Sequence, residues 1–87
     1  MRKRCTLDCE YFTGRKDAHE YISGKLGFPE YYGGNLDALN DCLTDMVPLT
    51  ITLKNADKAE EGSYAVTLIN FFKRLEEKHD DFKLIIK

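Results

Sequence analysis

The sequence predicts an α/β fold in which a three-stranded parallel β-sheet is flanked by about four helices. Two observations support this prediction. Short apolar or β-branched segments alternate with longer segments whose apolar residues recur at helical spacing. The chain of 87 residues is also long enough for one hydrophobic core but not for two. Strands that are joined through helices pair in parallel with right-handed connections. We therefore expect residues 1–87 to form a single domain.

The first half of the chain contains the patterns of one strand and two helices. Residues 4–7 are a plausible short strand. Thr13 can cap a first helix, and Gly27 stands where a residue in the left-handed conformation would end it. Asn35 is a good N-cap for a second helix, which runs to about residue 47 and is ended by Pro48.

The second half contains the patterns of two further strands and one long helix. Residues 49–53 alternate between apolar and β-branched polar side chains, and residues 82–86 are a second apolar run. Between them, residues 55–61 are a short, polar and weakly helical stretch, and a longer helix follows Ser63. The predicted inward faces of the last two long helices are Leu36, Leu39, Leu43 and Met46, and Ala65, Leu68, Ile69, Phe72 and Leu75.

Several classes of protein are disfavoured by composition. No segment approaches the roughly 18 apolar residues of a membrane span, and the basic start at residues 1–4 is not followed by the apolar region of a signal peptide. We therefore expect a cytoplasmic protein that does not bind membranes. Three cysteines, Cys5, Cys9 and Cys42, have neither the even number of a disulfide framework nor a CxxC spacing. We expect them to be reduced and to bind no metal.

The sequence contains no cluster of residues that is typical of an active site. A nucleophile needs a base within hydrogen-bond reach and a third group that orients the base. His19 lies between charged neighbours and His79 follows a charged helix end, so both are interpreted as solvated surface residues. Gly33-Gly34 lacks the spacing of a phosphate-binding loop. We expect neither an enzyme nor a bound cofactor.

The charge is distributed unevenly along the chain. The net charge is -2, but residues 30–61 contain seven acidic and only two basic side chains. Between Lys25 and Lys54 every charged side chain is a carboxylate. Such a surface would repel nucleic acid, so a cationic protein is the natural partner.

Three of these carboxylates, Asp37, Asp41 and Asp45, follow one face of the second helix at i, i+4 and i+8. Like charges at this spacing destabilise a helix slightly, and Asp45 lies near the negative end of the helix dipole. One interpretation is a surface that only keeps the protein soluble. The neighbouring Tyr31 and Tyr32 favour a binding surface, because aromatic anchors are typical of interaction sites.

Residues 29–44, with the sequence PEYYGGNLDALNDCLT, resemble the signature of the barstar family of intracellular ribonuclease inhibitors. The order of elements and the chain length also fit this family, although identity outside the signature is low. The resemblance implies a barstar-like fold with flavodoxin-like layering. It also implies that the second helix and the preceding loop enter the active site of a secreted, basic, barnase-type ribonuclease. A cis bond between Val47 and Pro48 is a further implication.

The resemblance also implies roles for individual side chains. Asp41 would occupy the position of a substrate phosphate and meet the arginines and the catalytic histidine of the nuclease. Asp37 would bind a neighbouring arginine, and Tyr31 would pack against the catalytic histidine. Asn35 and Leu36 would make the surrounding loop contacts. Arginine pairs with carboxylate and with phosphate through the same two-pronged geometry, so a carboxylate can replace the phosphate.

This chain departs from the family pattern at several contact positions. Asn40 replaces a tryptophan, and Asp45-Met46 replaces a Gly-Trp pair before a shorter loop. In the long helix, Phe71 aligns with a contacting valine and Arg74 with a contacting glutamate, so an acidic contact becomes basic. Phe71 could be a core residue or an exposed anchor. These differences predict a ribonuclease whose rim differs from that of barnase.

Two other functions stay open at this point. The same acidic face could belong to an adaptor that binds a different basic protein, or the chain could be a small enzyme with a concave pocket. We expect a monomer whose partner-binding residues are Tyr31, Asn35, Leu36, Asp37, Asn40, Asp41, Asp45, Phe71 and Arg74.

Overall fold

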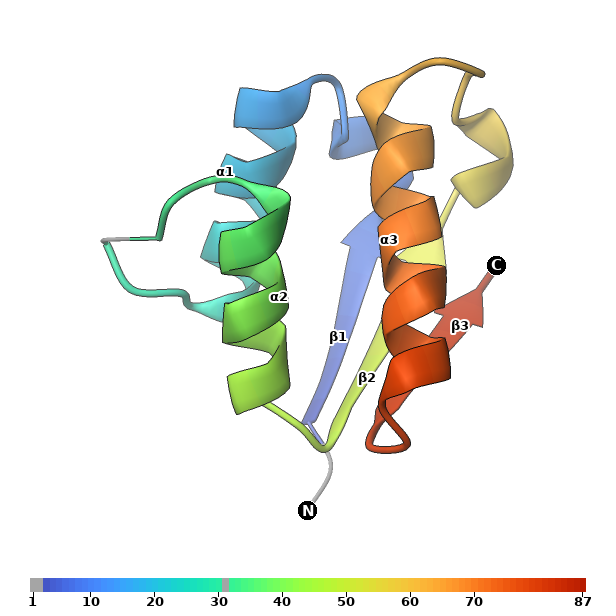
Figure 1. The fold of residues 1–87 in the computed structure, drawn as a ribbon. Helices are drawn as coiled ribbons and strands as arrows, with labels where there is room; N and C mark the ends of the chain where they lie inside the picture. The colour runs from blue at the N-terminus through green and yellow to red at the C-terminus, as the bar shows by residue number, and fades with distance from the viewer. Residues whose placement is uncertain (1–2, 31) are drawn as a thin grey trace.

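The protein is an α/β domain built on one small parallel sheet (Figure 1). The computed structural model describes residues 3–30 and 32–87. Strands β1 (Lys3–Asp8), β2 (Leu49–Lys54) and β3 (Phe82–Ile86) pair in parallel in the order β1-β2-β3. All three strands begin or end within one residue of the positions expected from the sequence, and their parallel pairing is confirmed.

The described residues contain three α-helices, and the expectation of about four is wrong. The helices are α1 (Arg15–Leu26), α2 (Leu36–Asp45) and α3 (Tyr64–Lys78). The polar stretch between β2 and α3 forms only a three-residue 3-10 helix, Ala56–Lys58. It has no apolar stripe to pack inward, and short helices depend on such packing for their stability. A second 3-10 helix, Cys9–Tyr11, was not expected from the sequence.

All three α-helices cover the same face of the sheet (Figure 1). The strand order advances in one direction, so right-handed connections place each helix on one side. The opposite face carries Arg4, Thr6 and Lys83, which are exposed. The domain therefore has two layers, whereas a flavodoxin-like fold has three.

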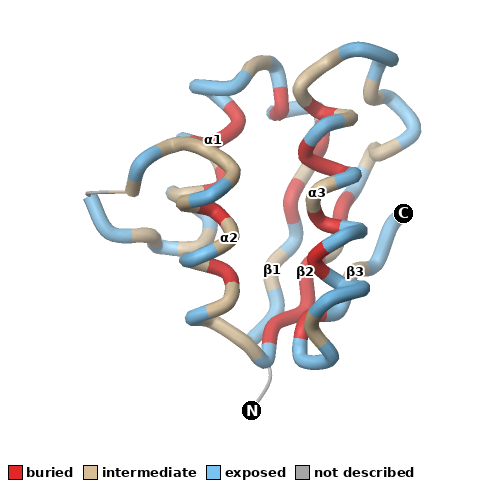
Figure 2. The backbone as a smooth tube through the Cα atoms, viewed as in Figure 1, coloured by how far each residue is buried: buried red, intermediate tan, exposed pale blue. Residues whose placement is uncertain are grey.

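The core lies between the helices and the sheet, where the buried helical positions face the strands (Figure 2). The three inward residues of β2 are completely buried. The predicted core residues Leu39, Leu43, Ala65, Leu68, Ile69, Phe72 and Leu75 are all buried, while Leu36 and Met46 are partly exposed. No helix in the described part of the chain is long and apolar enough to span a membrane.

The ends of the helices show where local sequence signals were sufficient and where they were not. Gly27 ends α1 in the left-handed conformation (φ 69°), and its N–H donates to the Ser23 carbonyl at 2.8 Å, as predicted. Thr13 does not cap this helix, because Gly14 occupies the cap position. The Thr13 hydroxyl instead donates to the Asp17 carboxylate at 3.2 Å. After the C-terminal end of α2, the Val47-Pro48 bond is cis, which confirms the implication of the resemblance.

Candidate functional site

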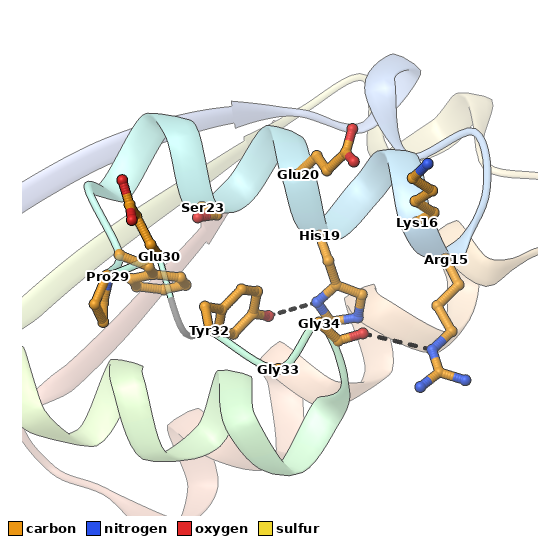
Figure 3. Close-up of a pocket in the computed structure, with 11 residues that line it drawn as sticks. Arg15, Lys16, His19, Glu20, Ser23, Pro29, Glu30, Tyr32, Gly33 and Gly34 are labelled. Carbon is orange, nitrogen blue, oxygen red and sulfur yellow. Dashed lines mark hydrogen bonds between the residues drawn. The ribbon is translucent and has the colours of Figure 1, made fainter.

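Tyr32 anchors the loop between α1 and α2 to the rest of the domain through a hydrogen bond and a ring contact. The Tyr32 hydroxyl lies 2.5 Å from Nδ1 of His19 on α1 (Figure 3). The backbone N–H of Tyr32 donates to the Pro29 carbonyl at 3.0 Å. The Tyr32 ring also lies against Phe28, with 4.9 Å between ring centroids. These contacts set the path of the loop immediately before α2. Tyr31, a predicted contact residue, lies outside the described residues.

His19 is a buried structural residue, and its interpretation as a solvated residue is wrong. It is only 2% exposed, and its Nε2 lies 2.7 Å from the hydroxyl of Tyr64 at the start of α3. Both ring nitrogens are therefore hydrogen-bonded to tyrosines. Burial, and then the nearby charge of Arg15, lower the pKa of His19, whereas burial raises the pKa of Tyr32 and of Tyr64.

The uncharged side chains of His19, Tyr32 and Tyr64 connect α1, the loop and the start of α3. A neutral imidazole has one donor and one acceptor nitrogen, so one tyrosine donates to His19 and the other accepts from it. The partners of His19 are 13 and 45 residues away in sequence. The local pattern gave one signal that could have revealed its burial: His19 lies beside Ala18 and one turn from Ile22, which are both buried in the core.

The start of α2 is defined by Asn35. Its side-chain Oδ1 accepts the N–H of Ala38 at 2.8 Å, which confirms the predicted N-cap. Arg15 of α1 lies close by, and its Nε donates to the Gly34 carbonyl at 3.5 Å (Figure 3). Because Oδ1 is occupied by the cap, the Nδ2 amide is the group of Asn35 that can serve a partner.

The carboxylates of Asp37, Asp41 and Asp45 all belong to exposed residues on α2. In residues 3–30 and 32–87, the one ion pair within 4.0 Å joins Lys58 and Glu10, far from α2 along the chain, at 2.9 Å. None of the three aspartates therefore has a cationic partner among these residues. The helix therefore carries a row of negative charge that forms no ion pair among the described residues.

Five of the predicted contact residues line one groove between α2 and α3. The groove has a volume of about 410 Å³. Leu36, Asp37 and Asn40 contribute from α2, and Phe71 and Arg74 contribute from α3, together with Leu75 and Lys78, which the sequence did not single out. Phe71 packs against the core and contacts the Phe72 ring at 5.6 Å, yet it also lines the groove. Phe71 is therefore partly buried against the core and partly open to the groove, and its role as an anchor for a partner stays a prediction.

Asp41 and Asp45 lie on the other flank of the helix. Both line a hollow of about 400 Å³ between α2 and the end of α1, where Lys3, Cys42 and Met46 also contribute. The acidic row therefore crosses α2 obliquely, from the α3 groove at Asp37 to the α1 side at Asp45. A partner that contacts all three carboxylates must lie across the exposed ridge of α2.

A further hollow, of about 700 Å³, lies between α1 and the loop and was not expected from the sequence (Figure 3). Its charged side chains are Arg15, Lys16, Glu20 and Glu30, and His19 and Tyr32 form part of its wall. The hydrogen bonds of His19 and Tyr32 are directed to each other and to Tyr64, so they are not positioned as a general base for a ligand. Among the described residues, no group of three His, Cys, Asp or Glu side chains could hold a metal ion.

Comparison with known proteins places the chain in a family. Residues 2–87 match the family described as "Barstar (barnase inhibitor)". The chain is also 42% identical over 92 aligned residues to the Bacillus subtilis (strain 168) protein named "Putative ribonuclease inhibitor YrdF", and the alignment covers 100% of both chains. The chain therefore belongs to the barstar family, whose members are inhibitors and not enzymes.

Proposed function

We propose that this protein inhibits a barnase-type extracellular ribonuclease by covering its cationic active site with α2 and the preceding loop. The observation that carries the proposal is the exposed row of Asp37, Asp41 and Asp45, which has no cationic partner in the described part of the chain. A nuclease active site binds a phosphate chain through arginine, lysine and histidine side chains. A row of carboxylates on a rigid helix can satisfy the same groups.

Within this proposal, Asp41 is the central group. It lies in the middle of the acidic row, where an enzyme placed across α2 excludes the most solvent, and it replaces a substrate phosphate. Asp37 binds a neighbouring arginine from its place beside the α3 groove. Asp45 lies nearer the rim. Contacts at the centre of an interface are usually worth more than contacts at the rim.

The loop completes the proposed binding surface. Asn35 and Leu36 contribute at the start of α2, and Tyr31 packs against the catalytic histidine of the enzyme. The anchoring of Tyr32 by His19 supports this role, because a loop held in place before binding loses less conformational entropy when the complex forms. Asn40, Phe71 and Arg74 supply contacts that differ from the family pattern and so favour a ribonuclease other than barnase.

The proposal also specifies the conditions of binding. The inhibitor acts in the cytoplasm as a monomer and without a cofactor. It does not bind nucleic acid directly, because the acidic row repels phosphate. The opposite charges of the partners accelerate their association and make it sensitive to salt, a rule for which a barnase-type complex is itself a standard example.

A ribonuclease titration tests the proposal. The protein is added to a panel of barnase-type ribonucleases, including any that is encoded beside its gene, and cleavage of a fluorescent RNA substrate is followed. At least one enzyme should lose its activity at a one-to-one ratio. The control is a variant in which Asp37 and Asp41 are both replaced by Asn, which keeps the shape but removes the charge. Undiminished cleavage throughout the panel at excess inhibitor would instead favour an adaptor that binds another basic protein.

A further inference from the structure

The groove between α2 and α3 has walls of opposite charge. Asp37 lies on the α2 wall, and Arg74 and Lys78 lie one turn apart on the α3 wall. Apolar side chains of Leu36, Phe71 and Leu75 lie between them and pack partly or fully into the core. The groove is therefore a cleft with an acidic wall on α2, a basic wall on α3 and an apolar floor.

The charged side chains of the two walls form no ion pair with each other. Asp37, Arg74 and Lys78 all belong to exposed residues, and none of them takes part in an ion pair within the described residues. Arg74 and Lys78 are spaced at i, i+4, where like charges repel slightly, as do Asp37 and Asp41. Neither row contributes to the fold through a contact with the other, so both remain available to a partner.

We propose that this groove receives a rim segment of the ribonuclease that carries an acidic side chain, bound by Arg74 and Lys78. The acidic group would lie beside the basic group that Asp37 binds. This inference rests on the proposed function and specifies the charge of the partner there. The guanidinium of Arg74 can bind a carboxylate through two parallel hydrogen bonds, and Lys78 adds a second positive charge. The apolar floor accommodates the aliphatic part of the incoming side chain.

The same two cations determine which enzymes are rejected. A basic residue opposite α3 would be placed against Arg74 and Lys78, and such juxtaposition of like charges in an interface is strongly unfavourable. The acidic row on α2 suits any nuclease with a cationic active site. The α3 wall therefore selects among such nucleases according to the charge of the rim.

Charge reversal in matched pairs tests this selection. The groove variant carries Arg74→Glu and Lys78→Glu, and the control carries Lys73→Glu and Lys83→Glu, two exposed lysines that do not line the groove. Both variants change the net charge equally. Dissociation constants are measured at about 0.15 M salt for the ribonuclease that the wild type inhibits most strongly. We expect the groove variant to bind roughly tenfold or more weakly than the control.

A second arm identifies the acidic side chain. Each acidic rim residue of that ribonuclease is changed in turn to Lys, and both inhibitor forms are tested. We expect one such change to weaken the wild-type complex and to restore binding of the groove variant. If the groove variant loses its far-UV circular dichroism signal, Arg74→Gln with Lys78→Gln replaces it, because this pair removes the charge without adding carboxylates.

The possible outcomes separate the two proposals. Equal binding by the groove and control variants, or tighter binding by the groove variant, overturns the acidic rim while the wild type still inhibits and the proposed function stands. Inhibition of no ribonuclease by the wild type overturns the proposed function, and this inference with it.

Discussion

Two polar regions of this small domain use their charges in opposite ways. At the ends of β1 and β2, Asp8 accepts hydrogen bonds from Asn55 Nδ2 and from the Glu10 N–H, both at 2.9 Å, and Lys58 pairs with Glu10. On α2, three carboxylates extend into solvent without a cationic partner in the described part of the chain. The contacts at the ends of β1 and β2 connect the two 3-10 helices to the sheet.

The difference separates charges that take part in the fold from charges that, in the proposed function, bind a partner. The hydrogen bond from Asn55, followed by that from the Glu10 N–H, holds the pKa of Asp8 below its usual value, so the folded state favours its ionised form. His19, with both ring nitrogens bonded to tyrosines, also belongs to the structural class. The carboxylates of α2 form no ion pair within the described residues that offsets their mutual repulsion, and only Asp37, in the first turn, interacts favourably with the helix dipole. Substitutions should therefore divide cleanly between effects on stability and effects on inhibition.

The largest effect should come from Asp41→Ala. Loss of the central carboxylate leaves the cations of the enzyme buried without a partner, which costs about 3–5 kcal/mol and corresponds to inhibition weakened by about 100-fold or more. The free energy of unfolding should change by less than about 0.5 kcal/mol, as is usual at exposed positions. Inhibition constants and urea unfolding curves measure the two effects.

Asp45→Ala and Asp8→Ala are the matched controls for this substitution. Asp45→Ala should weaken inhibition by less than about tenfold, because exposed ion pairs at a rim contribute little. Asp8→Ala should lower the unfolding midpoint and leave inhibition unchanged. Equal losses of inhibition for Asp41 and Asp45 would contradict the proposed central position of Asp41.

The next largest effect is expected from His19→Phe. Phenylalanine is somewhat larger than histidine and offers no hydrogen bond, so the hydroxyls of Tyr32 and Tyr64 lose their partner. A buried hydroxyl without a partner costs about 1–3 kcal/mol. Urea unfolding should show this loss, and His19→Gln should recover part of it, because an amide can both donate and accept. A loss of inhibition greater than that of Asp41→Ala would show that His19 belongs with the binding groups.

Asn35 lies at the boundary between the two classes, and two substitutions can separate its roles. Asn35→Ala removes the N-cap of α2 and should lower the free energy of unfolding by about 1 kcal/mol. Asn35→Asp keeps a capping oxygen but removes the Nδ2 donor, so it should preserve stability and weaken inhibition. Thermal unfolding and inhibition assays on both variants provide the measurements. If Asn35→Asp inhibits as well as the wild type, the amide has no role in binding.

The mildest perturbation is a fall in pH. The pKa of His19 is lowered in the folded protein, so the unfolded chain takes up this proton first. The contribution of neutral His19 to stability is complete above its ordinary pKa of about 6.5 and is lost as the pH falls through the lower folded value. Urea midpoints between about pH 7.5 and 5 should therefore decline. The decline should be smaller in His19→Phe, and an equal decline would assign it to other groups.

Local signals predicted much of this fold, and their failures have specific causes. The cap at Asn35, the left-handed Gly27 and the apolar stripes of α2 and α3 depend on residues within a few positions of one another. Thr13 failed as a cap because the chain provides Gly14 one residue later, and several neighbouring residues can occupy a cap position. His19 was misjudged because its charged neighbours indicate solvent, whereas its tyrosine partners come from distant segments.

The candidate site divides in the same way. The sequence showed the spacing of Asp37, Asp41 and Asp45 on one helix, and the resemblance to the barstar family implied a partner for Asp37 and Asp41. Their lack of a compensating cation could not be read from the chain, because seven basic side chains follow Asp45 at Lys54 and beyond and any of them could have folded back. The structure leaves that row without an ion pair among the described residues.

The sequence by itself determined the order of strands and helices, the core faces, the acidic character of α2 and the family. These properties depend on periodicity and on local side-chain chemistry, which act over one or two turns. Only the tertiary structure decided that His19 is buried between two tyrosines, and that Arg74 and Lys78 lie across a groove from Asp37. Those placements depend on how α1, α2 and α3 pack on one face of the sheet, and packing joins residues whose separation along the chain carries no local signal.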